Sequence, residues 1–185
     1  MRLFMAVEPG EAFVQAALAA QKRLKRSCAD VKWTAPYSMH FTLHFLGEVQ
    51  DERLAAAEKA LEAVSVFPVF DVFLSGAGFF PPQGAPRVLW LGVDDGAGNM
   101  RSLAELLGSS LRSGGFETDA RPFVPHLTLG RVRGPRGMKD LLSELAGLSL
   151  PQERPSLCVK SVELIRSELR PEGPVYTVLK SVKLK

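Results

Sequence analysis

His40-Phe41-Thr42-Leu43 recurs as His126-Leu127-Thr128-Leu129, so the chain contains two His-x-Thr-Leu tetrads, each in a run of β-forming residues. Successive side chains of a β-strand point to opposite faces. The His and the Thr of each tetrad therefore share one face, and the two hydrophobic residues take the other. We expect the polar face of each strand to line a site and its hydrophobic face to pack on the core. The three histidines of the chain, His40, His44 and His126, all lie in or beside these tetrads.

The stretches around the tetrads repeat at the same offset of 86 residues, the step from position 40 to position 126. Without gaps, this offset also pairs Leu3–Val7 with Leu89–Val93, Pro36-Tyr37 with Pro122-Phe123, and Glu11–Arg26 with Ala97–Arg112. These coincidences predict a single domain, residues 1–185, with pseudo-repeats of about 1–86 and 87–185. Each half would supply one His and one Thr to a shared cleft. The alternative is that two αβ units look alike because such units generally do.

The flanks of the tetrads carry a family resemblance. The flanks of the first tetrad are Lys32-Trp33 and Phe45-Leu46-Gly47, and those of the second are Arg121-Pro122-Phe123, Pro125 and Gly130-Arg131. With these flanks, the chain resembles the RNA 2′,3′-cyclic phosphodiesterases, also called 2′-5′ RNA ligases, of the 2H phosphoesterase superfamily. The resemblance covers essentially the whole chain. It implies an α+β fold: an internally duplicated, two-lobed domain in which two antiparallel sheets form a central groove with helices outside.

The composition agrees with one globular domain. A chain of 185 residues that is 46% hydrophobic can bury a sizeable core. The net charge of +3 permits a phosphate-bearing partner without requiring one. Cys28 and Cys158 are too few for a disulfide framework and lack metal-ligand spacing, so we expect reduced thiols in a cytoplasmic protein. The N-terminal apolar run is too short for a signal peptide, and no run approaches the roughly 20 residues of a membrane span.

The hydrophobic pattern also predicts the order of the secondary-structure elements. Strands are expected at about 2–7, 31–34, 39–46, 69–80, 88–93, 126–132, 157–169 and 175–184, and helices at about 11–27, 51–64, 99–112 and 138–148. Both tetrads fall on strands in this prediction. The strand assignment matters, because it places each His on the same face as its Thr.

Paired imidazoles suit the opening of a cyclic phosphodiester. Water attacks phosphorus and a ribose oxygen leaves in line, so the reaction needs a base on one side and an acid on the other. Two imidazoles can supply both, since His titrates near pH ~6.5. Thr42 and Thr128 can each donate a hydroxyl to a non-bridging phosphate oxygen and stabilise developing charge. This scheme calls for no metal or other cofactor.

The resemblance implies the roles of the two histidines: His40 is the proton donor and His126 the proton acceptor, an order that the symmetry of the sequence does not set. The implied reaction is metal-independent hydrolysis of RNA 2′,3′-cyclic phosphodiester ends to 2′-phosphomonoesters. Run backwards, the imidazoles exchange roles, which makes 2′-5′ RNA ligation chemically accessible. The expected partner is RNA with 2′,3′-cyclic phosphate ends, tRNA fragments included, bound by a monomer without membrane association.

Two residues beside the tetrads are further candidates for substrate binding. Arg131 follows the second tetrad as in the family. Strict alternation turns it away from the His face, but a bulge after Gly130 would bring it round. His44 shares the face of His40 by alternation, although its counterpart in the second half is Gly130. A run of positive charge then continues, and we expect it to support Arg131 at the RNA phosphates: Arg133, Arg136 and Lys139.

Two other classes of protein remain open at this point. One is a metalloenzyme, because His40 and His44 have the i, i+4 spacing of a helical zinc pair. The β-forming residues between them, the missing Glu of the zincin motif and the lack of an evident third ligand argue against it. The other class is a non-catalytic RNA-binding module with the same fold. The two intact tetrads argue against that reading.

Overall fold

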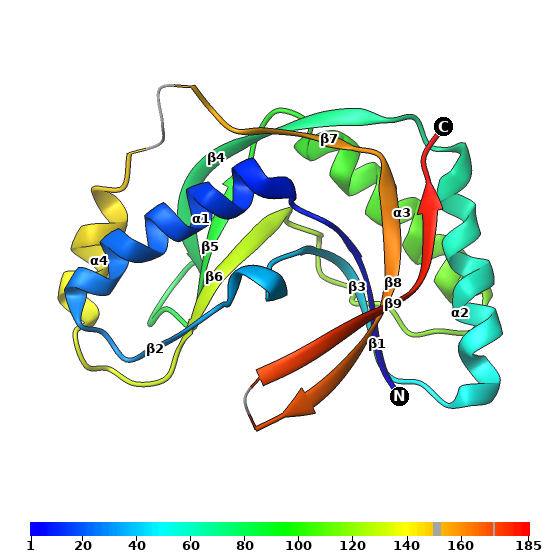
Figure 1. The fold of residues 1–185 in the computed structure, drawn as a ribbon, viewed down its shortest axis with the longest axis horizontal. Helices are drawn as coiled ribbons and strands as arrows, with labels where there is room; N and C mark the ends of the chain where they lie inside the picture. Colours follow the sequence, from blue (N-terminus) through cyan, green and yellow to red (C-terminus); the bar gives the residue numbers. More distant parts are fainter. Residues whose placement is uncertain (150–152, 172) are drawn as a thin grey trace.

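The structure is a computed structural model that describes residues 1–149, 153–171 and 173–185, and two antiparallel sheets form its frame (Figure 1). The first sheet has the strand order β3-β1-β8-β9. Its strands are β1 (Arg2–Val7), β3 (Phe41–Glu48), β8 (Ser161–Arg170) and β9 (Gly173–Lys183). The second sheet has the order β2-β6-β5-β4-β7. Its strands are β2 (Val31–Trp33), β4 (Phe70–Phe80), β5 (Val88–Val93), β6 (His126–Val132) and β7 (Ser156–Val159). The expected α+β architecture with two antiparallel sheets is confirmed.

Each of the two long helices contacts strands of the other half of the chain. The α-helices are α1 (Gly10–Leu24), α2 (Leu54–Leu61), α3 (Ala97–Ser113) and α4 (Met138–Ala146), with 3₁₀ turns η1 (Lys25–Ser27), η2 (Pro36–Ser38), η3 (Asp51–Arg53) and η4 (Glu62–Val66). Helix α1 contacts β6 and β7 of the second sheet, and α3 contacts β3 of the first. Figure 1 shows α1 across the second sheet and α2 with α3 beside the first. This exchange ties the two halves together.

Strand pairing is the same around both tetrads. In the first sheet Met5 pairs with His44 and Ala6 with Thr42, so Leu43 is an extra residue in β3. In the second sheet the corresponding pairs are Leu89 with Gly130 and Trp90 with Thr128, so Leu129 is an extra residue in β6. Both catalytic-strand candidates therefore contain a β-bulge at the last residue of the tetrad. Equivalent residues of β3 and β6 are 86 positions apart, whereas equivalent residues of β1 and β5 are 84 positions apart. The ungapped offset of 86 residues is therefore wrong by two residues for β1 and β5.

One hydrophobic core spans both halves of the described chain. It includes Leu3, Met5 and Phe41 from the first half and Leu89 and Leu127 from the second, all fully buried. These residues lie on the strand faces turned toward the helices, as the alternating pattern predicts. A second, smaller cluster lies on the other face of the first sheet: Phe4, Ala6 and Ile165, with Tyr176 packed against them. That face is the one on which His40 packs.

Three predicted elements differ from the observed ones, one strand and two helices. The strand predicted at 157–169 is two strands, β7 and β8, because the chain leaves the second sheet at Lys160 and enters the first. Hydrophobic periodicity does not register such a change of sheet. Predicted helix ends at 27 and 64 are 3₁₀ turns, η1 and η4. No helix in the described ranges is long and apolar enough to cross a membrane.

Candidate active site

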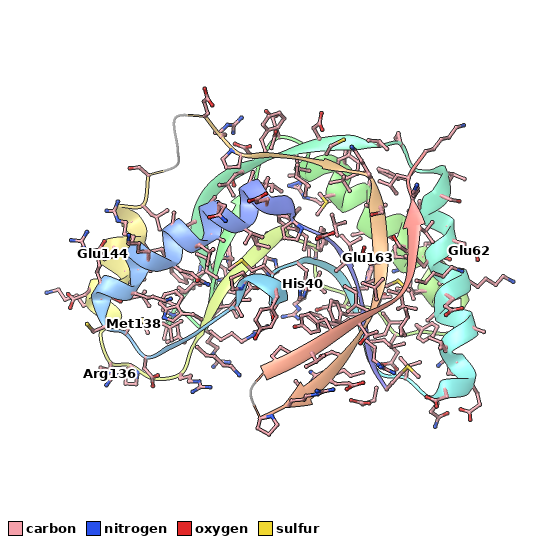
Figure 2. All side chains as sticks on the ribbon, in the orientation of Figure 1. His40, Glu62, Arg136, Met138, Glu144 and Glu163 are labelled. Atoms are coloured by element: carbon pink, nitrogen blue, oxygen red, sulfur yellow. The ribbon has the colours of Figure 1, made fainter. Side chains whose placement is uncertain are left out.

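His40 lies in an aromatic niche directly before β3. Its ring centroid is 4.6 Å from that of Phe4 in β1 and 5.4 Å from that of Tyr176 in β9. Burial lowers the pKa of His40 to about 4; a hydrogen bond with the Ser38 backbone opposes this shift, and the charges of His126 and Arg131 add to it. The His40 imidazole is therefore neutral at pH 7 when no anion is bound. Figure 2 shows His40 in the middle of the molecule, between the two sheets.

His126 begins β6 and has a niche of the same kind in the second sheet. Its ring centroid is 5.0 Å from that of Phe80, edge-on, and 6.5 Å from that of Trp90. Nδ1 of His126 lies 2.8 Å from the carbonyl oxygen of Val124, which can only accept, so Nδ1 carries the proton and Nε2 presents a lone pair. Burial lowers the pKa of His126, the Val124 bond opposes this, and the charge of Arg131 lowers it further. The imidazole is thus held in the tautomer suited to a base.

A cleft of about 770 Å³ lies beside these niches. Four predicted site residues line it: Thr42, His44, His126 and Arg131. His40 and Thr128 are absent from its lining; His40 packs against Phe4 and Tyr176, and Thr128 pairs with Trp90 across the β5–β6 ladder. The charge of His126 acts on the pKa of His40, and that of Arg131 acts on both, so the three side chains share one electrostatic environment.

The bulge in β6 accounts for the position of Arg131. We predicted a bulge after Gly130; the structure has it one residue earlier, at Leu129. The extra residue restores Arg131 to the face of His126, where it lines the cleft. In β3 the equivalent bulge restores Phe45, which also lines the cleft and is 62% exposed. Arg131 and Phe45 thus occupy equivalent places on the two strands.

His44 has a hydrogen bond that the sequence did not indicate. Its Nε2 lies 2.7 Å from the carbonyl oxygen of Ala104 and donates to it, which ties β3 to α3. The ring also lies against α3 at Gly108, where a Cβ atom would come within 3.0 Å of Cε1. The bulge at Leu43 breaks the alternation that placed His44 with Thr42. His44 still lines the cleft and remains a candidate for substrate binding, but its ring already has a structural partner.

The cationic lining of the cleft differs from the predicted one. Arg87 and Arg121 line the cleft together with Arg131. Arg133, Arg136 and Lys139 are not among its lining residues, and Figure 2 shows Arg136 near Met138, far from His40. Arg87 precedes β5, whose pairing with β6 brings it beside Arg131. Only that pairing could have identified Arg87 from the sequence. Arg121 is held by Asp119, with Nε 3.0 Å from both carboxylate oxygens.

The metal-site alternative has no support in the described residues. Residues 41–48 form a strand, so the i, i+4 helical spacing of His40 and His44 does not apply. Within residues 1–149, 153–171 and 173–185 there is no group of three or more His, Cys, Asp or Glu placed to hold a metal ion.

The sequence did not indicate the aromatic rings that surround the two histidines: Phe4, Phe80, Trp90 and Tyr176. They come from four different strands, and no local motif marks them.

Comparisons with known proteins give matches along nearly the whole chain. The family model described as LigT-like phosphoesterase matches the chain twice, over residues 7–90 and 91–176. The chain is 37% identical to an RNA 2′,3′-cyclic phosphodiesterase of Methanothermobacter thermautotrophicus over 185 residues, covering 100% of this chain and 99% of the relative. It is 36% identical to the enzyme of the same name from Thermus thermophilus, over 100% of this chain and 91% of that protein.

Solved structures of similar proteins have the same fold. The crystal structure of TT0787 of Thermus thermophilus superimposes with a TM-score of 0.78 at 31% identity and covers 99% of this chain and 97% of its own. The crystal structure of E. coli LigT complexed with 3′-AMP gives a TM-score of 0.76 at 26% identity, with the same coverage. The likeness extends over nearly the full length of both proteins in each case.

Proposed function

This chain belongs to the LigT-like phosphoesterase family, and from that premise we propose that it hydrolyses RNA 2′,3′-cyclic phosphodiester ends to 2′-phosphomonoesters. The observation that carries the proposal is the matched pair of imidazoles, each in an aromatic niche and both under the charge of Arg131. The names of the full-length relatives support the substrate class. A non-catalytic RNA-binding module with the same fold is the weaker alternative, because both tetrads are intact.

In the proposed reaction, His126 accepts the proton of the attacking water. Its Nδ1 is occupied by the Val124 carbonyl, so Nε2 is free for that proton. His40 donates a proton to the leaving 3′-oxygen as the P–O3′ bond breaks and the new P–O bond forms. Because the pKa of His40 is low in the free protein, its protonated form has to be stabilised when the substrate binds. The negative charge of the phosphodiester stabilises the imidazolium. The phosphate remains on the 2′-oxygen.

Three further residues bind the phosphate in this scheme. Thr42 and Thr128 donate their hydroxyls to non-bridging oxygens, as their places in the tetrads suggest. Arg131 pairs with the phosphate charge, an assignment supported by its position in the cleft and by its effect on both imidazoles. No group in the scheme is a metal or cofactor. Activity should therefore survive EDTA.

A change of leaving group tests the division into acid and base. With a 2′,3′-cyclic nucleotide in EDTA, His40→Ala and His126→Ala should each lower kcat by about 10²–10⁴-fold, the range for general acid or base catalysis. A nitrophenyl phosphodiester has a leaving group that needs no proton. On that substrate His40→Ala should recover most of its rate and His126→Ala should not. The opposite pattern would reverse the two roles.

Ligation and the setting of the enzyme belong to the same proposal. When a 5′-hydroxyl replaces the attacking water, His126 accepts its proton, the P–O5′ bond forms, and the P–O3′ bond breaks as His40 protonates the 3′-oxygen. The enzyme should therefore also join a 2′,3′-cyclic end to a 5′-hydroxyl end, weakly, as a 2′-5′ RNA ligase. We propose that it acts as a monomer in the cytoplasm, with tRNA fragments among its substrates. The exposed, free thiols of Cys28 and Cys158 are in keeping with a reducing compartment. Incubation of labelled RNA ends with analysis of the linkage tests the ligation.

A further inference from the structure

The bulge in β6 has a side-chain partner in another element, the amide of Gln21. Gln21 lies in α1 and is 2% exposed. Its Nε2 donates hydrogen bonds to the carbonyl oxygens of Leu129 and Thr34, each at 2.8 Å. The Leu129 carbonyl also accepts the backbone N–H of Thr34 at 2.9 Å. Gln21 therefore ties the end of β2 to Leu129, the β6 residue that the bulge leaves out of the β5 ladder.

The clamped residue controls the direction of Arg131. Leu129 follows Thr128 directly and precedes Arg131 by two positions. Without the extra residue at Leu129, regular alternation would turn Arg131 away from the face of His126. A buried backbone carbonyl in a bulge still needs hydrogen-bond donors, and the regular ladder does not supply all of them. The Gln21 amide is such a donor, and it comes from a helix outside the sheet.

We infer that Gln21 is a positioning residue, which holds the β6 bulge in the form that presents Arg131 to the substrate phosphate. The inference rests on the proposed function, in which Arg131 binds that phosphate. Gln21 is not in the cleft lining and acts through the Leu129 carbonyl. A Met side chain at position 21 would fill the same space but remove the donor. The bulge can then relax toward regular pairing, and Arg131 leaves the cleft.

A purely structural role for Gln21 would be to attach α1 to the second sheet. Two measurements separate the roles. The first is the coupling between Gln21 and Arg131 in substrate affinity, because a merely structural residue loses the same factor whether or not Arg131 is present. The second is the pKa of His126 in the free protein. The charge of Arg131 lowers that pKa, so withdrawal of Arg131 from the cleft raises it, whereas a uniform loss of stability does not.

The experiment compares Gln21→Met, Arg131→Ala and the double variant on a short RNA with a 2′,3′-cyclic phosphate end. Gln21→Met should raise KM about fivefold or more in the wild-type background but less than about twofold in the Arg131→Ala background, because coupled residues are not additive. NMR titration should show the pKa of His126 raised in Gln21→Met, in the same direction as in Arg131→Ala. Should Gln21→Met not fold, Gln21→Leu carries the same expectations.

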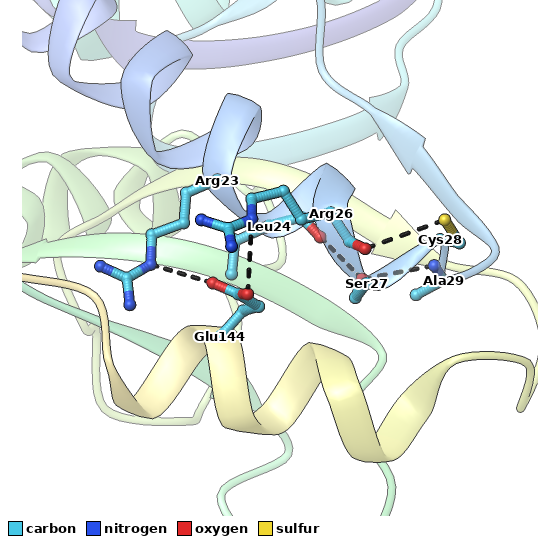
Figure 3. Close-up of polar contacts among 7 residues, drawn as sticks. All are labelled: Arg23, Leu24, Arg26, Ser27, Cys28, Ala29 and Glu144. Atoms are coloured by element: carbon cyan, nitrogen blue, oxygen red, sulfur yellow. Dashed lines mark hydrogen bonds and ion pairs between the residues drawn. The ribbon is translucent and has the colours of Figure 1, made fainter.

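Ser27→Ala is the matched control, since Ser27 is another buried polar residue at the end of the same helical segment. It is 6% exposed, and its Oγ donates to the Leu24 carbonyl at 2.6 Å and accepts from the Ala29 N–H at 3.3 Å, two hydrogen bonds that involve no β6 residue (Figure 3). This variant should lower Tm and leave KM and the His126 pKa unchanged. Equal KM increases in both backgrounds, or an unchanged His126 pKa in folded Gln21→Met, would overturn the inference. An unchanged KM in Arg131→Ala would instead remove the phosphate role of Arg131, and the NMR titration would still decide on the bulge.

Discussion

Each histidine of the candidate pair has two aromatic rings as neighbours and one backbone group as a hydrogen-bond partner. For His40 the rings are Phe4 and Tyr176, and for His126 they are Phe80 and Trp90. The rings exclude water, and this burial is the main reason why both pKa values lie below the ordinary value. In the proposed mechanism His40 is the acid, so its imidazole, neutral in the free protein, has to gain its proton together with the substrate. The pKa of His40 should therefore be higher in the substrate complex than in the free protein.

That difference can be measured in the pH dependence of the reaction. The profile of kcat/KM reports the free enzyme, and that of kcat reports the complex. Because free His40 has a pKa of about 4, its active, protonated form declines as the pH rises above that value, and kcat/KM should fall toward neutral pH. The bound phosphate favours protonation, so the alkaline limb of kcat should lie at higher pH than that of kcat/KM. Coincident alkaline limbs would contradict a substrate-assisted protonation of His40.

At the scale of strands, each tetrad places its histidine where a strand begins, His40 directly before β3 and His126 as the first residue of β6. Alternation correctly separates Thr42 and Thr128 from the buried Leu43 and Leu129. It fails beyond the tetrads, because each bulge adds one residue and thereby reverses the faces that follow. Arg131 comes into the cleft for that reason. A bulge depends on partners from other elements, such as the Gln21 amide, and these partners are not visible in a local pattern.

The sequence also predicts the helices without predicting where they pack. The amphipathic pattern of α1 and α3 indicates that each covers a sheet, and the core residues confirm it. The pattern contains no information on which sheet that is. In the structure α1 lies on strands of the second half and α3 on a strand of the first. The change of sheet at Lys160 escapes prediction for the same reason, since β7 and β8 have similar hydrophobic patterns.

Strand β4 offers a test of how the His126 niche is built. The Trp90 ring lies over Gly78, where an added Cβ atom would overlap with Cζ2 and Cη2 of the indole. Gly78→Ala must therefore displace Trp90, and with it the packing around His126. We expect kcat/KM to fall about tenfold and the free energy of unfolding to drop by about 1–3 kcal/mol, the usual cost of overpacking. Gly76→Ala in the same strand is the control, because nothing lies within 4 Å of the added Cβ. Similar effects of the two substitutions would contradict the packing argument.

At the scale of the whole molecule, the two sequence halves are tied together by shared packing. A single core cluster joins buried residues of both halves, and each long helix covers the other half's strands. Hydrogen bonds at the two bulged strands also join the two halves. Gln21 of α1 holds β6, and His44 of β3 is bonded to Ala104 of α3. The geometry of the cleft thus depends on contacts between halves, which supports the proposed pseudo-repeats as parts of one domain.

Charge is also organised at the scale of the whole molecule. The net charge is only +3, but Arg87, Arg121 and Arg131 line the same cleft. One of them, Arg121, is already paired with Asp119. Arg131 serves the scissile phosphate in the proposed function. Arg87 is then the cleft cation available for a neighbouring phosphate of an RNA chain, which a mononucleotide lacks.

This assignment predicts a salt effect that depends on substrate length. Binding of an oligonucleotide 2′-phosphate, the proposed product, should weaken with rising salt, and each phosphate contact with a single strand contributes about 0.7 to the log–log slope. Arg87→Ala should reduce the magnitude of that slope by about 0.7 for the oligonucleotide and leave it unchanged for a nucleoside 2′-phosphate. Lys59→Ala on α2, with the same loss of charge outside the cleft, is the control. Equal slopes for Arg87→Ala and the unaltered protein would mean that the cleft binds the terminal nucleotide alone, because a cation that touches a phosphate necessarily competes with salt for it.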